Sequence, residues 1–156
     1  MRSRTANWFE CKVQYEKVME DGLQKKVKEL YTVDALSFSE AEARIIEEMA
    51  AYISGEYEVV DIKKAKYKEI FFSDDPMADR FYKAKLQFIT IDEKTEKEKR
   101  QNVLYLVQAG SLNGALKKID EVMGGTMIDY ASVEIKETAL MDVIEYKSMT
   151  NNEEGE

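Results

Sequence analysis

Lysines interleaved with aromatic side chains are the residues whose types and spacing point most directly to a chemistry. The stretch "KKAKYK" (63–68) places lysines on both sides of a tyrosine, and "WFECKVQY" (8–15) and "FYKAKLQF" (81–88) alternate lysine and glutamine with rings. Lysine ammonium groups contact phosphates and rings stack on bases, a combination typical of surfaces that bind single-stranded nucleic acid. The candidate binding residues are Trp8, Lys12, Lys63, Lys66, Tyr67, Lys68, Phe81, Lys83 and Lys85.

The same residues also have a purely structural interpretation. Lysines are common on exposed strand faces, where they keep sheet edges from associating. No RNP-type motif accompanies them, and the formal net charge of −8 argues against a protein that coats duplex DNA by bulk electrostatics. A binding face and a solvated strand surface therefore both remain open.

Enzyme chemistry has few candidate residues in this chain. There is no histidine, which is the usual general base and the commonest metal ligand, and Cys11 is the only cysteine. We expect Cys11 to be a small core residue rather than a nucleophile. Asp74, Asp75 and Asp79 fit a polar turn beside Pro76 better than a divalent-cation site, which needs ligands from several elements. We therefore expect no enzyme, no metal and no cofactor.

The cellular setting follows from the same composition. No apolar run approaches the ~20 residues of a transmembrane helix, and "MRSRTANWFE" has no apolar stretch that would serve as a signal peptide. A lone cysteine cannot form an intramolecular disulfide, which fits an intracellular protein. We expect a cytoplasmic protein with no membrane contact.

An internal repeat supplies the elements that position these residues. "YTVDALSFSEAEARIIEEM" (31–49) and "YLVQAGSLNGALKKIDEVM" (105–123) align without a gap and share Tyr31/Tyr105 and Ile45/Ile119. The flanking stretches 8–15 and 60–71 match 81–88 and 133–144 at almost the same offset. This constancy predicts a tandem duplication.

Each repeat has the periods of two strands, a helix and a third strand. Alternation from Phe9 to Tyr15 is typical of a strand with one buried face, and Asp21–Gly22 favours a two-residue hairpin turn. The hairpin of the second repeat is expected to have a longer, highly charged loop at 91–102. Apolar residues at helical spacing follow, including Ile45 in the first repeat and Ile119 in the second. Residues 59–72 are predicted to form one long third strand, bent near Lys64.

The helix starts are predicted from side chains that cap backbone N–H groups. Ser39 is expected to cap the first helix, with Glu42 three residues later completing a capping box. Asn113 takes the place of Ser39 in the second repeat. Gly124–Gly125 is expected to close that helix, as glycine does at a left-handed cap.

The predicted fold class is α+β. Two β-β-α-β units, at 6–71 and 79–146, are joined by a linker at 72–78, and an acidic tail at 147–156 is expected to be disordered. One such unit alone has a marginal core. We therefore expect the two copies to bury their apolar faces together as one compact pseudo-twofold domain, a pseudodimer within one chain.

The chain resembles a known family over nearly its whole length. The stretches "NWFECKVQYEK", "KKVKELYTVDALSFSEAEARIIEEM" and "YEVVDIKKAKYKEIFF" are similar to an uncharacterised family of about 150 residues found in Bacteroidetes and their phages. That resemblance implies no activity and no catalytic residue. It does imply a setting near phage or mobile-element DNA. The duplicated pattern is also similar to the PUR and Whirly single-strand binders at the level of architecture only.

Two functions follow as expectations. The first is a non-enzymatic module that binds single-stranded DNA or RNA on its sheet faces. The second is a protein-interaction or assembly module that binds a partner through exposed strand edges or acidic helices.

Overall fold

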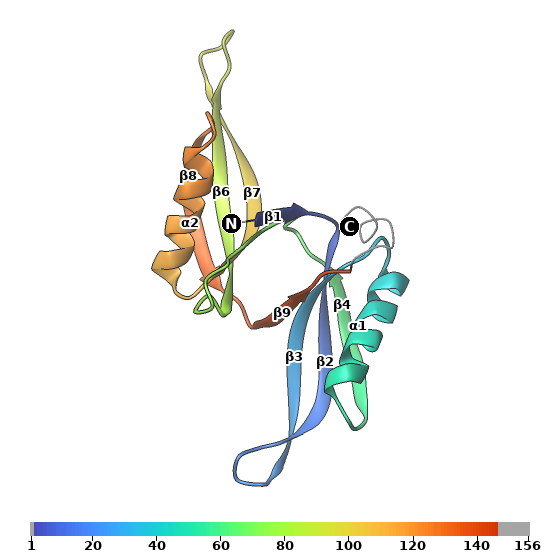
Figure 1. Cartoon of the computed structure of the whole chain (residues 1–156). Coiled ribbons are helices and arrows are strands. Elements are labelled where there is room, and N and C mark those ends of the chain that lie inside the picture. The colour runs from blue at the N-terminus through green and yellow to red at the C-terminus, as the bar shows by residue number, and fades with distance from the viewer. Residues whose placement is uncertain (1, 147–156) are drawn as a thin grey trace, which may run out of the picture. The chain divides into compact units, whose positions relative to one another are not determined.

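The computed structural model describes residues 2–146, and these form two helices and nine strands in two mixed sheets (Figure 1). The predicted α+β class is therefore confirmed. The residues divide into two compact units, which are described separately. Unit 1 contains residues 2–5 and 66–139, and unit 2 contains residues 6–65 and 140–146. The sequence had predicted one compact domain. The predicted tail, 147–156, lies outside the described residues.

Unit 2 is a four-stranded sheet covered on one face by a helix. Its elements are β2 (Trp8–Val18), β3 (Gln24–Asp34), α1 (Phe38–Tyr52), β4 (Tyr57–Lys64) and β9 (Leu140–Ile144). The strand order is β4-β2-β3-β9, and only the β3–β9 pair is parallel. The β2–β3 hairpin turns at Gly22, where it was predicted, and the φ of +84° suits glycine. Residues 19–23 join the two strands, however, in place of the predicted two-residue turn.

Unit 1 has the same hairpin, helix and strand and one more edge strand. Its elements are β1 (Arg2–Thr5), β5 (Glu69–Phe72), β6 (Arg80–Ile91), β7 (Glu98–Ala109), α2 (Leu112–Gly124) and β8 (Asp129–Glu137). The strand order is β1-β5-β7-β6-β8, with the β5–β7 pair parallel. The sequence did not predict β1. The loop of the β6–β7 hairpin is shorter than the predicted 91–102, because β7 begins at Glu98.

Each unit has its own hydrophobic core between helix and sheet. The core of unit 2 packs Ala41, Ile45 and Met49 of α1 against the apolar face of β2 and β3, including Cys11. The core of unit 1 repeats this arrangement with Ile119 of α2. Ile45 and Ile119 are fully buried, as the helical spacing predicted. Neither helix in the part described is long and apolar enough to cross a bilayer.

The main departure from the sequence prediction is an exchange of strands between the two halves of the chain. Residues 59–72 do not form one strand. They form β4 in unit 2 and β5 in unit 1, separated by residues 65–68. β9 likewise leaves the second half and joins unit 2. The two parallel pairings have matching registers, with Ile70 beside Leu106 and Val143 beside Thr32. The predicted ranges 6–71 and 79–146 thus each extend across both units, and the tandem duplication stays a prediction.

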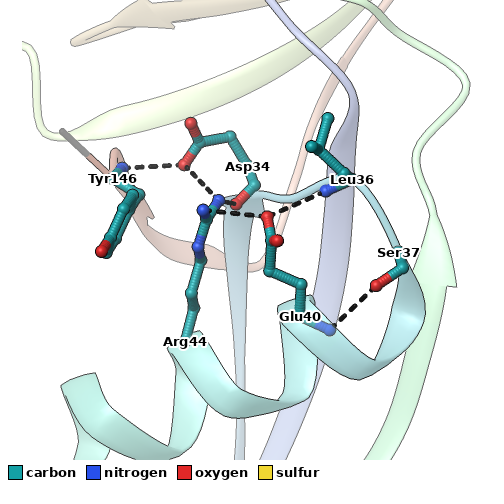
Figure 2. Close-up of polar contacts among 6 residues, drawn as sticks. All are labelled: Asp34, Leu36, Ser37, Glu40, Arg44 and Tyr146. Carbon is teal, nitrogen blue, oxygen red and sulfur yellow. Dashed lines mark hydrogen bonds and ion pairs between the residues drawn. The ribbon is translucent and has the colours of Figure 1, made fainter. Parts of the chain in front are cut away.

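A lock at its end holds the exchanged strand β9 in place (Figure 2). The Asp34 carboxylate accepts a hydrogen bond from the Tyr146 N–H at 2.8 Å. Arg44 of α1 donates to the Asp34 carbonyl, forms an ion pair with Glu40 at 2.8 Å, and lies over the Tyr146 ring at 3.9 Å. The carboxylate and the guanidinium thereby fix the backbone just after β9.

The end of β5 is held in the same way by different chemistry. Gln108 accepts a hydrogen bond from the Ser73 N–H at 2.9 Å and donates to the Ala78 carbonyl. Lys118 of α2 donates to the Phe72 carbonyl at 3.1 Å, and burial lowers the pKa of this lysine. Each exchanged strand therefore ends against one polar side chain of the hairpin and one cation of the helix.

The helices begin two residues earlier than predicted. The hydroxyl of Ser37, not Ser39, accepts from the Glu40 N–H, and the Glu40 carboxylate accepts from the Leu36 N–H (Figure 2). Ser111, not Asn113, caps α2. Gly125 does cap the C-terminus of α2, but at φ −81° rather than in the left-handed region.

Candidate nucleic-acid interface

The face of the unit 1 sheet opposite α2 carries two of the candidate lysines, Lys83 and Lys85. On β6, Tyr82, Ala84 and Leu86 point into the helix-covered core. Because successive strand residues point to opposite faces, Lys83, Lys85 and Gln87 lie on the other face, which we call the open face.

Two lysines stand directly opposite each other on this open face. Lys83 of β6 is the register partner of Lys136 of β8, and the next pair along the strand is Lys85 with Glu134. Lys136 is exposed, whereas Lys83 and Lys85 are half-buried. Like charges directly opposite each other destabilise a sheet, so packing alone does not favour the Lys83–Lys136 pair.

Unit 2 carries opposite charges at the matching places. There the last pair before the register shift is Lys12 with Asp61, and two residues earlier Glu10 stands opposite Lys63. The shift in unit 1 falls at the same place, just after Lys85. The open face of unit 1 thus has three lysines and one glutamate where unit 2 has two lysines and two carboxylates.

The segment that precedes β5 places Tyr67 beside the open face of unit 1. The Tyr67 ring lies 5.8 Å from the Lys83 ammonium, measured to the ring centroid, which is a cation–π distance. Tyr67 is buried, while Lys66 and Lys68 on either side of it are exposed. We give the name lysine face to the three lysines on the open face together with the two that flank Tyr67: Lys66, Lys68, Lys83, Lys85 and Lys136.

The aromatic residues among the candidates are not exposed. Trp8, Tyr67 and Phe81 are only 1–3% exposed. The expectation that the rings of Trp8 and Phe81 stand free to stack on bases is therefore wrong for this structure. Alternation predicts which face a residue lies on, but not whether other parts of the chain cover that face.

The structure separates the nine candidates into two groups. Lys66, Tyr67, Lys68, Phe81, Lys83 and Lys85 lie in unit 1, whereas Trp8, Lys12 and Lys63 lie in unit 2. The sequence analysis missed Lys136, which strand pairing places beside Lys83. The signal for it was present, since residues 133–144 match 60–71, and Lys136 aligns with Lys63 in this comparison.

A row of polar contacts, also missed, continues along the open face toward the β6–β7 turn. Arg100 donates to the Gln87 side-chain oxygen at 3.2 Å, and the Gln87 amide donates to the Asn102 oxygen at 3.1 Å. The Arg100 Nε lies 3.5 Å from the Glu98 carboxylate. The sequence pattern treated residues 91–102 as a loop, so it gave no reason to place these side chains together.

The described residues do not form a good site for a nucleophile or for a metal ion. Cys11 is buried in the core of unit 2, and burial, with the negative charges of Asp61 and Glu10, raises its pKa to about 12. Its thiol is thus protonated at neutral pH. Among residues 2–146, no group of three carboxylate, cysteine or histidine side chains is placed to hold a metal ion.

A family model described as Domain of unknown function (DUF4494) matches residues 7–146. The chain belongs to this family. The DUF4494 match covers both units together and leaves out β1, so the exchanged strands β5 and β9 are both part of the family domain. No curated protein and no solved structure matches the chain.

Proposed function

We propose that this protein is a non-enzymatic module that binds single-stranded DNA or RNA on the lysine face of unit 1. The observation that carries the proposal is the direct opposition of Lys83 and Lys136. A bound phosphate offsets the repulsion between the two ammonium groups and accepts hydrogen bonds from both. The matching pairs in unit 2 each join a cation to an anion, so the opposed lysines distinguish unit 1 from unit 2.

The acidic composition is compatible with this proposal. The net charge of −8 belongs to the whole chain, whereas affinity for a single strand depends on the cations that contact its phosphates. Within the lysine face, Lys83 stands opposite a lysine, and Lys85 stands opposite a glutamate, Glu134, on the neighbouring strand. We expect weak binding that depends strongly on salt.

The cellular context is part of the proposal. The resemblance to a family of Bacteroidetes and their phages supports a role near phage or mobile-element DNA, where single strands arise during replication and transfer. We propose that the protein acts in the cytoplasm of such cells.

The test is the affinity of labelled oligo-dT at low salt, measured by fluorescence anisotropy for the wild type and two charge reversals. Lys136→Glu should weaken binding about tenfold, because it removes a charge-assisted hydrogen bond and adds repulsion. Lys63→Glu makes the same change in net charge at the matching place in unit 2, and should leave the affinity nearly unchanged. Circular dichroism checks that both variants fold.

The salt dependence supplies a second readout. Lys136→Ala should flatten the slope of log affinity against log salt by about 0.7, the value for one lost contact with a single strand. Absence of binding, or equal losses in the Lys136→Glu and Lys63→Glu variants, would contradict the proposal and favour the protein-interaction alternative.

The structure bears on how such a protein partner binds. The edge strands β4 and β8 each carry a register shift, and bulges of this kind oppose the addition of another strand. A partner that binds β4 or β8 by strand addition is therefore disfavoured, which leaves the edges at β1 and β9 and the helix surfaces as the candidates under that alternative.

A further inference from the structure

The polar row beside the lysine face has a defined orientation. Gln87 accepts from Arg100 through its oxygen and donates to Asn102 through its nitrogen, so both ends of its amide are engaged. Gln87 and Asn102 are register partners on β6 and β7. We call Gln87, Arg100 and Asn102 the amide relay.

The amide relay presents donors rather than acceptors to a ligand. Arg100 has five N–H donors, and only its Nε and one Nη face Glu98 and Gln87. The oxygen of Asn102 accepts from Gln87, which leaves the NH₂ group of Asn102 as the end that a ligand meets. Arg100 and Asn102 are both exposed. A ligand that fits this relay carries two neighbouring acceptors.

The amide relay lies on the same face of the sheet as the lysine face, next to it along β6. Gln87 follows Lys85 on the same face of β6, about 6.8 Å further along the strand. A single strand whose phosphates contact Lys83, Lys85 and Lys136 therefore brings a neighbouring base to Arg100 and Asn102. Guanine has two adjacent acceptors, O6 and N7, that suit an arginine fork, and this pairing is the commonest specific contact between arginine and a base.

Unit 2 shows that the fold does not need this relay. At the matching place Gln14 has Lys28 as its register partner on β3, in place of an asparagine. The hairpin forms in both units. Folding of the hairpin therefore does not explain why residue 102 is an asparagine.

We propose that the amide relay reads a guanine base in a single strand that the lysine face holds. This inference rests on the proposed function and adds a base preference to it. The guanine O6 and N7 accept from the Arg100 guanidinium, while the Asn102 amide donates to the same edge. Gln87 is a positioning residue that holds both donors.

The experiment compares labelled strands of equal length by anisotropy: oligo-dT, and oligo-dT carrying isolated dG, inosine or 7-deaza-dG. We expect the dG strand to bind the full-length protein about tenfold more tightly than oligo-dT. Inosine keeps O6 and N7 and should match dG. The 7-deaza base lacks the N7 acceptor and should bind like oligo-dT.

Variants separate this inference from the proposed function. Arg100→Lys and Gln87→Ala should remove the preference for dG while oligo-dT binding persists, and Gln14→Ala in unit 2 should leave the preference intact. Equal binding of dG and dT strands by the wild type, or a preference that survives Arg100→Lys, overturns the guanine assignment and leaves the lysine face standing. Absence of binding to every strand overturns both.

Discussion

The thiol of Cys11 is kept protonated by its surroundings. Burial, with Asp61 and Glu10 nearby, raises its pKa from 9.0 to about 12. A group whose pKa is raised by folding contributes stability below its unfolded pKa, and this contribution is lost as the pH rises toward the folded pKa. The loss attributable to Cys11 therefore falls between about pH 9 and pH 12.

We expect Cys11→Ala to reduce the decline in stability at alkaline pH. The measurement is the free energy of urea unfolding at pH 8 and at pH 10.5 (both roughly chosen to bracket the unfolded pKa), for wild type and variant. Tyr15 and Tyr31 also have raised pKa values, so the difference between the two proteins is the quantity of interest. Equal declines would show that the thiol does not ionise on unfolding.

For individual residues, the sequence predicted correctly which face of the sheet a side chain lies on, but not whether that side chain is exposed to solvent. Alternation placed Trp8 and Phe81 opposite the core-facing Phe9 and Tyr82, in agreement with the two core clusters. It gave no information about coverage of that second face, where both rings are buried. Whether that face is buried depends on contacts between residues far apart in the chain, and the alternation of residues along one strand carries no information about such contacts.

For the secondary-structure elements, the sequence was ambiguous about where the first helix begins. Ser37 with Glu40 and Ser39 with Glu42 both have capping-box spacing, and the sequence analysis chose the second pair. The helix, its apolar stripe and the hairpin turn at Gly22 were all predicted, because each depends on residues close together in the chain.

Alanine substitution distinguishes the two serines. Ser37→Ala removes the hydroxyl that accepts from the Glu40 N–H, and should lower the free energy of unfolding by about 1 kcal/mol. Ser39→Ala lies inside α1 and should change it by less than about 0.5 kcal/mol. Urea unfolding of the two variants is the measurement. A larger loss for Ser39→Ala would be inconsistent with the cap at Ser37.

The exchange of strands is the whole-molecule feature that the sequence did not predict, and the repeat itself explains why. The composition of β5 and β9 predicts that they are strands, but it does not predict which of the two sheets each strand joins. The two strands that receive them, β3 and β7, have the same residues at Tyr31/Tyr105 and Val33/Val107. Two nearly equivalent partners leave the choice to the lengths and paths of the connections.

The exchange also ties the stability of each unit to the other through the chain. β9 reaches unit 2 only through residues 66–139 of unit 1. If unit 1 unfolds, holding β9 in place closes a loop of about 70 residues, which costs roughly 4 kcal/mol. A five-residue edge strand provides little to offset this cost, so β9 should leave unit 2.

Trp8 is the only tryptophan and lies in unit 2, so its fluorescence reports on that unit. Ile119→Asp places an unpaired charge in the buried core of unit 1, at a cost of several kcal/mol. We expect this variant to shift the Trp8 unfolding midpoint to lower urea, although residue 119 is not in unit 2. Lys94→Ala, an exposed change in unit 1, is the control. An unchanged midpoint in the Ile119→Asp variant would show that the units unfold independently.

The exchanged strands β5 and β9, each held at its end by polar contacts, have a consequence for a chain that has been cut by a protease. Cleavage in the exposed turn near Asp75 separates β1–β5 from β6–β9. The first piece then carries β1 and β5, which complete the sheet of the second, and the second carries β9, which completes the sheet of the first. The strand pairs β5–β7 in one sheet and β3–β9 in the other still join the two pieces after the covalent link is cut. We therefore expect the protein to reassemble from two separately made pieces divided at this turn.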